Sequence, residues 1–183
     1  MDEFLFRIAT ESDFAAVAEI ALKSFLLAYA GIFSRAEIEA LVSESYAPPT
    51  LARFVEQAGR AETHFEVVTR SDERLVGFCV MGSGRTPAQR KFYHRFYSRM
   101  IGHLYRLYLD PAFTGKGVGH ALMSRGEDFL RERGIFRYSC YVHRGNEIGK
   151  RFYLREGFRH VAEKDRGDDW YMEKSLLMRA LVG

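Results

Sequence analysis

Cysteine and proline are scarce in this chain of 183 residues, which has only two cysteines and four prolines. Cys79 and Cys140 both lie in apolar segments, so we expect two reduced core residues and no disulfide framework. Lys23 interrupts the richest apolar region, and we therefore expect no membrane-spanning segment. Cysteine and histidine do not recur at metal-ligand spacings, so no metal site is predicted.

An excess of charge of one sign is also missing. The chain carries 27 basic and 24 acidic residues, a formal net charge of +3, so its overall charge does not favour nucleic acid as a partner. The segment Met1-Asp2-Glu3 is acidic and lacks the basic region of a signal peptide, so we expect a cytoplasmic protein. The length suits one α/β domain over residues 1–183, and no linker or repeat divides it.

One stretch combines a strand, a glycine-rich turn and a helix. Leu104 to Leu109 is an apolar, aromatic run of strand length, which Asp110-Pro111 ends. After the turn, apolar residues recur at helical spacing up to Gly134, where a helix is expected to end. Glycines let the backbone approach a ligand, and the start of a helix carries a partial positive charge. The turn therefore predicts a site for phosphate oxygens, formed by Thr114, Gly115, Lys116, Gly117, Val118, Gly119 and His120.

The spacing of these glycines fits neither the dinucleotide fingerprint nor the Walker loop. Gly117 and Gly119 match the second half of the pattern Gln/Arg-x-x-Gly-x-Gly/Ala, in which Thr114 replaces the usual Gln or Arg. Residues 146–158 match a second pattern, Asn-x-x-Ala/Gly-x-x-Phe/Leu-Tyr-x-Lys/Arg-x-Gly-Phe, which begins at Asn146 and includes Tyr153. Together the two patterns resemble the GCN5-related N-acetyltransferase (GNAT) family, in its bacterial small-molecule type.

The resemblance implies the GNAT fold, an α/β arrangement with a central, mostly antiparallel sheet of about six to seven strands and flanking helices. In that fold two parallel strands splay apart, and here they are residues 104–109 and 136–142. The residue patterns themselves predict strands at 4–9, 65–69, 75–81, 158–162 and 170–175, and helices from Thr10, Ser34, Pro48 and Glu147.

The link at residues 83–101 is expected to be a helical insert, because aromatic residues recur in it at helical spacing. It is basic throughout and contains Arg85, Arg90, Lys91, Arg95 and Arg99. A helix packed on the sheet edge with a solvated basic face is the favoured interpretation. A lid over the acceptor, a contact between two copies in a homodimer, and a patch for an anionic partner remain open.

The resemblance also implies an activity, the transfer of an acetyl group from acetyl-CoA to a primary amine of a small molecule by direct attack. It assigns Tyr153 as the acid beside the thioester sulfur and Asn146 to the pantetheine arm. The backbone of Leu107, Tyr108 and Leu109 is expected to pair with the pantetheine amides. His103 stands where many relatives carry a glutamate, which makes it the candidate general base.

Other acceptors and functions stay open at this point. The acid excess of residues 1–58 suits a cationic acceptor such as a polyamine, although acidic helix faces are commonly just solvated surface. A peptide or protein, acetylated at its N-terminus or at lysine, is the alternative acceptor. A coenzyme A-binding regulatory module without catalysis is the alternative function.

Overall fold

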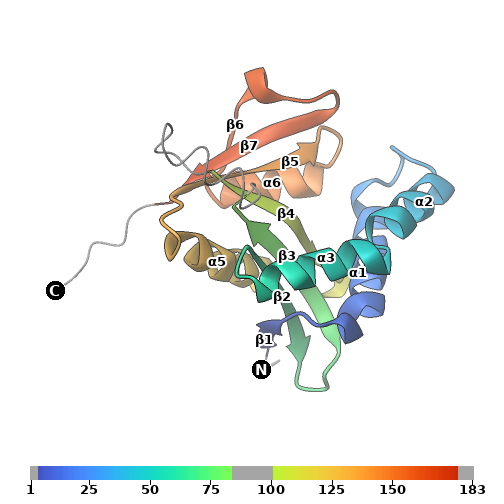
Figure 1. Ribbon diagram of the computed structural model, residues 1–183. Coiled ribbons are helices and arrows are strands. Elements are labelled where there is room, and N and C mark those ends of the chain that lie inside the picture. The colour runs from blue at the N-terminus through green and yellow to red at the C-terminus, as the bar shows by residue number, and fades with distance from the viewer. Residues whose placement is uncertain (1–3, 84–100, 177–183) are drawn as a thin grey trace.

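The structure is a computed structural model that describes residues 4–83 and 101–176. Its centre is a seven-stranded sheet with the strand order β1-β2-β3-β4-β5-β7-β6 (Figure 1). Neighbouring strands are antiparallel except for β4 and β5, which are parallel. The sequence-based expectation of a mixed α/β fold with one parallel pair is therefore confirmed. The predicted insert helix at 83–101 falls almost wholly outside the described residues.

The N-terminal half supplies three strands and three helices. The strands are β1 (Phe4–Ile8), β2 (Thr63–Arg70) and β3 (Leu75–Gly82), and the helices are α1 (Phe14–Ala28), α2 (Arg35–Ser45) and α3 (Pro48–Gly59). Ser34 and Glu37 form the expected capping box of α2, and the prolines at the start of α3 replace donors that a helix leaves unused. The helix expected from Thr10 begins with a 3-10 turn, Glu11–Asp13, because Asp13 folds back onto the Thr10 amide.

The C-terminal half alternates strands and helices. It contains β4 (Gly102–Leu109), α5 (Val118–Arg131), β5 (Arg137–His143), α6 (Glu147–Arg155), β6 (Arg159–His160) and β7 (Asp169–Ser175). Short 3-10 turns lie at Pro111–Phe113 and Ala162–Lys164. Strand β6 is shorter than the pattern at 158–162 predicts, because the chain turns at Val161 into the second of these turns.

The sheet separates two apolar cores. On one face, α5 and the Phe152–Tyr153 pair of α6 pack with a cluster that includes Cys79, Leu122 and Cys140. On the other face, α1, α2 and α3 cover a cluster that includes Phe65, Phe78 and Leu51. Cys79 and Cys140 are both buried free thiols, as expected. Strand β3 is buried along its whole length because both cores press on it.

The parallel pair stays together over a short distance only. Strand β4 pairs with β5 at Gly102 and His103, opposite Tyr138 and Ser139, and then the two strands part. On its other side β4 remains paired with β3 from His103 to Leu109. Tyr105 is skipped in this pairing, which makes it the extra residue of a β-bulge. The structure thus provides the splayed pair, with a bulge at the point of parting.

No helix among the described residues is long and apolar enough to cross a membrane. Within the same residues, no group of acidic, histidine and cysteine side chains is arranged to hold a metal ion.

Candidate active site between β4 and β5

The glycine-rich turn lies at the start of α5 and has the backbone that the sequence predicts. Gly117 caps the helix with φ of 80°, and Gly115 has φ of 77°, a left-handed conformation that favours glycine. At this end of the helix, the Ala121 amide donates to the Gly117 carbonyl at 3.0 Å. The amides of Val118, Gly119 and His120 precede the helix ladder, so they lack an acceptor within α5.

Gly119 sets how closely α5 approaches the parted strands. A Cβ atom there would lie 3.3 Å from the Phe152 ring of α6 and 3.4 Å from a methyl group of Leu109 in β4. A Cβ at Gly115 or Gly117 would meet nothing within 4 Å. The turn therefore combines an open side, where main-chain amides face outward, with a closed side against β4 and α6. This cradle fits a pyrophosphate group.

Side chains of the turn stabilise its shape. The Thr114 hydroxyl donates to the Pro111 carbonyl at 2.9 Å, so it holds the turn where relatives of the predicted family have Gln or Arg. The Lys116 ammonium lies 5.0 Å from the centre of the Phe113 ring. His120 Nδ1 lies 2.9 Å from a Glu156 carboxylate oxygen, and this contact ties the start of α5 to the end of α6. Thr114, Lys116 and His120 are all exposed.

Helix α6 places the second pair of predicted residues. The Asn146 side-chain oxygen accepts from the Gly149 amide at 2.7 Å, which makes Asn146 the N-cap. Asn146 also lies close enough to Tyr29, the residue that follows α1, to affect the pKa of that phenol. Tyr153, two turns further along, packs on Phe158 with ring centres 5.2 Å apart, and burial raises its pKa well above the usual value. The Tyr153 phenol is therefore protonated at neutral pH.

Tyr108 is buried and lies close to three other tyrosines. Tyr29, Tyr46 and Tyr153 all perturb the pKa of Tyr108, and burial is the main cause of its rise. Tyr108 stacks on Phe25 with ring centres 5.3 Å apart, and its hydroxyl donates to that of Tyr46. The side chain of Tyr108 therefore belongs to the α1–α3 core, while Leu107 and Leu109 pack on the α5 side. Along Leu107–Leu109, the edge of β4 that faces β5 has no strand partner among the described residues.

His103 lies at the end of the gap where the two strands still pair. Its Nδ1 is 3.2 Å from the Ser139 hydroxyl, and its ring contacts Tyr105 and Tyr141. Burial, with a contribution from the Arg166 charge, lowers the His103 pKa from 6.5 to about 4. The imidazole is therefore neutral at neutral pH, able to accept a proton but weakly basic.

Sequence patterns missed Arg106 and the loop that it holds. The Arg106 guanidinium lies 4.1 Å from the centre of the Tyr46 ring and donates to the Ser45 carbonyl at 2.8 Å. It also donates to the Tyr46 hydroxyl. These contacts fix the α2–α3 junction against β4 beside the gap. Sixty-one positions separate Arg106 from Ser45, so no local pattern reveals the contact.

The fold and the glycine-rich turn together suit a protein that binds a phosphate-bearing ligand beside a parted parallel strand pair. A family model described as the acetyltransferase (GNAT) family matches residues 28–158. The chain belongs to this family, and it is an acetyltransferase whose acyl donor is acetyl-CoA.

The chain is similar to named acetyltransferases. It is 30% identical over 165 residues to a spermidine N(1)-acetyltransferase of Thermoplasma acidophilum. This alignment covers 88% of this chain and 91% of the relative. A crystal structure of the PaiA N-acetyltransferase of Thermoplasma acidophilum in complex with coenzyme A has a TM-score of 0.80 and 28% identity, covering 94% of this chain and 99% of that one. A shorter match, 43% over 64 residues, links 35% of the chain to 20% of a mycothiol acetyltransferase of Propionibacterium freudenreichii.

Proposed function

We propose that the protein transfers the acetyl group of acetyl-CoA to a primary amine of a small molecule, within a ternary complex. The observation that carries this proposal is the open edge of β4 at Leu107–Leu109, which lies between the glycine turn and Tyr153. Acetyl-CoA supplies the acyl group as an activated thioester. The similarity to a spermidine N(1)-acetyltransferase supports an amine acceptor.

The residues of this chain have separate tasks. The backbone from Thr114 to His120 binds the pyrophosphate, with Lys116 adding charge at the rim. Main-chain groups of Leu107, Tyr108 and Leu109 pair with the pantetheine amides in the manner of an added strand. The Asn146 side chain is already held by the Gly149 amide, so it is preorganised to orient the arm.

Proton transfer is divided between two residues. Tyr153 keeps its proton because its pKa is raised by burial, and it donates to the sulfur as the carbon–sulfur bond breaks. His103 is the proposed acceptor of the amine proton, which must be lost before nitrogen has a lone pair to attack with. With a pKa of about 4 it is a weak base, so the amine needs to bind largely in its neutral form.

Two assays test this function. Titration calorimetry with acetyl-CoA measures binding, and thiol release in the presence of primary amines measures transfer. Tyr153→Phe is expected to lower kcat about 100-fold with the acetyl-CoA Kd unchanged, the range for loss of a general acid. Tyr138→Phe is the matched control, because Tyr138 is a buried tyrosine on the α5 side that bonds Glu127 and lies outside the gap. Thiol release with a peptide but with no small amine would refute the proposal in favour of a peptide acceptor.

A further inference from the structure

A line of aromatic rings crosses the sheet on the face that carries α1–α3. Phe54 of α3 contacts Tyr105, Tyr105 contacts His103, His103 contacts Tyr141, and Tyr141 contacts Tyr171. The distances between ring centres are 5.7, 4.9, 5.9 and 5.3 Å in that order. We call these five residues the ring line. It joins α3, β4, β5 and β7, and it passes directly over the place where β4 and β5 part.

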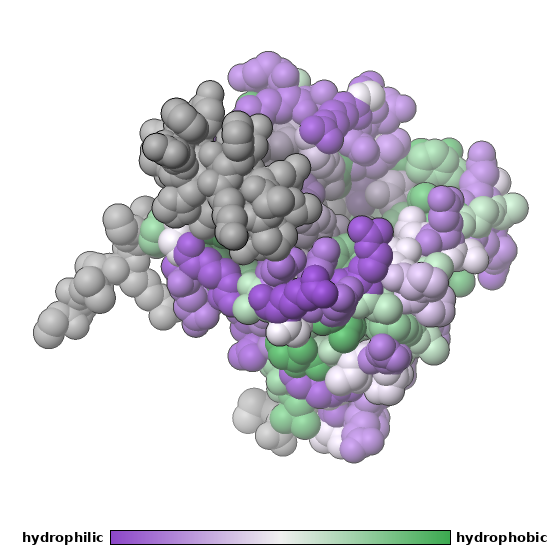
Figure 2. All heavy atoms as spheres, in the orientation of Figure 1, coloured by the Kyte–Doolittle hydropathy of each residue, from purple (hydrophilic) through white to green (hydrophobic). Residues whose placement is uncertain are grey.

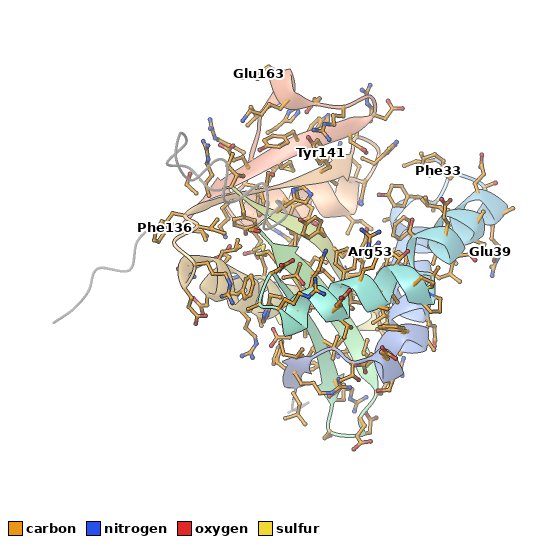
Figure 3. The ribbon with its side chains drawn as sticks, viewed as in Figure 1. Phe33, Glu39, Arg53, Phe136, Tyr141 and Glu163 are labelled. Carbon is orange, nitrogen blue, oxygen red and sulfur yellow. The ribbon has the colours of Figure 1, made fainter. Side chains whose placement is uncertain are left out.

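The ring line is accessible where it meets the gap. Tyr105 has 39% of its surface exposed because it is the bulged residue of β4, and His103 and Tyr141 are half-buried. The space-filling view shows this face hollowed between helices α1–α3 and the β5–β7 end of the sheet (Figure 2). In Figure 3, Tyr141 is labelled on β5, and Phe33 of the α1–α2 loop lies across from it. Tyr105, His103 and Tyr141 therefore present ring surface on the face that carries α1–α3.

Positive charge borders the ring line. The Arg166 guanidinium lies 4.8 Å from the Tyr141 ring centre, and the Arg106 guanidinium lies 5.4 Å from that of Phe54. Neither arginine forms an ion pair with a carboxylate in the part of the chain that the structure describes. The buried acid of this region, Glu173, is already neutralised, since Arg159 lies 2.9 Å from it and Lys164 3.4 Å.

Negative charge on this face is confined to one end. Asp169 is exposed and lies opposite His143 in the pairing of β5 with β7. Its charge contributes to the raised pKa of Tyr29. Three acids of the N-terminal helices form ion pairs on their own helices, Glu19–Lys23, Glu39–Arg35 and Glu56–Arg60. Glu39, labelled in Figure 3, lies on the outer side of α2. These three carboxylates of residues 1–58 are therefore already paired with a basic side chain.

We propose that the acceptor is a monoamine with an aromatic or apolar body, which lies on the ring line while its single amino group reaches the gap. This inference rests on the proposed function and narrows its substrate. Rings and exposed apolar surface favour a flat or apolar body. Arg106 and Arg166 repel a second ammonium group, so a diamine or polyamine is a poorer acceptor.

Paired amines separate the two parts of the proposal. Butylamine and putrescine differ by a second ammonium group, and 2-phenylethylamine differs from butylamine by a ring. At pH 8, kcat/KM is expected to be about tenfold higher for butylamine than for putrescine, and about tenfold higher again for 2-phenylethylamine. Spermidine is expected to rank with putrescine.

Variants tie these ratios to the named side chains. Arg166→Gln removes one exposed charge that also acts on His103, so the readout is a ratio between amines. The ratio of kcat/KM for putrescine to kcat/KM for butylamine should rise at least threefold. Tyr105→Leu should lower kcat/KM for 2-phenylethylamine about tenfold, mostly through KM, and Tyr105→Phe should restore it. Thermal melts and the acetyl-CoA Kd check that each variant is folded.

The outcomes distinguish this inference from the proposed function. Putrescine or spermidine used better than both monoamines, with Arg166→Gln having no effect, would overturn the monoamine assignment and leave the amine acetyltransferase standing. Acetyl-CoA binding with no transfer to any amine of the series would overturn both.

Discussion

Gly117 offers the sharpest test of how the turn binds acetyl-CoA. Its φ of 80° costs an L-residue about 1 kcal/mol or more, and a Cβ atom there meets no atom within 4 Å. Gly117→Ala should therefore fold, with a melting temperature lowered by about 2–4 °C. The added methyl group lies on the open side of the turn, which is the side proposed to face the pyrophosphate.

The expected loss of affinity follows from hydrogen bonding. A bond from a backbone amide to a charged oxygen contributes about 1.5–3 kcal/mol, so loss of one raises the acetyl-CoA Kd about 10- to 100-fold. Titration calorimetry at fixed ionic strength measures this change. The heat of binding should fall with the affinity, because the lost contact is a charge-assisted hydrogen bond.

Gly134→Ala is the matched control. Gly134 follows the other end of α5, has φ of 68°, and also has nothing within 4 Å of an added Cβ. The two variants should share the loss of thermal stability, and Gly134→Ala should bind acetyl-CoA within twofold of the native protein. Equal affinities for both variants would refute the assignment of the turn as the pyrophosphate cradle.

Three further predictions concern protonation and the core. The His103 pKa is about 4 in the folded protein and about 6.5 in the unfolded chain, so between these pH values protons bind the unfolded chain preferentially. The free energy of unfolding should therefore fall by about 3 kcal/mol as the pH drops through this window. Urea titrations should show a flatter pH dependence of that free energy for His103→Gln. Burial raises the Tyr153 pKa, so the kcat of the native protein should not fall through loss of the phenol proton up to pH 10. A decrease of kcat with rising pH below pH 10 would argue against Tyr153 as the acid. Glu127 is buried and bonded by Tyr138 and Lys174, each at 2.6 Å, so Glu127→Ala should cost about 3–5 kcal/mol in urea unfolding while the acetyl-CoA Kd of the folded fraction stays unchanged.

Local patterns predicted the elements that carry their own signals. Asn146 caps α6 as its sequence position suggests, and the helix spans Glu147–Arg155 as expected. Gly117 likewise marks the start of α5, because only a residue tolerant of positive φ suits that cap. The hairpin of β2 and β3 was also readable from two apolar runs around a polar turn.

Contacts between distant segments were not predictable in this way. The bulge at Tyr105 depends on the pairing with β3, and a period-two pattern cannot reveal which residue the partner strand skips. The order that places β7 between β5 and β6 is set by packing of the completed sheet. The His103 site could be located only through resemblance. Its low pKa comes first from burial and then from Arg166, a residue 63 positions later, and only the fold creates both conditions.

The brief pairing of β4 with β5 has a consequence for the life of the protein in a cell. Two residue pairs are a thin seam between a four-stranded piece and a three-stranded piece. In the proposed complex, a donor molecule bound in the opening would act as an eighth strand that joins the two pieces. Without acetyl-CoA, the two pieces would separate more often and proteases would cleave the chain faster. The abundance of the protein would therefore follow the supply of its own substrate.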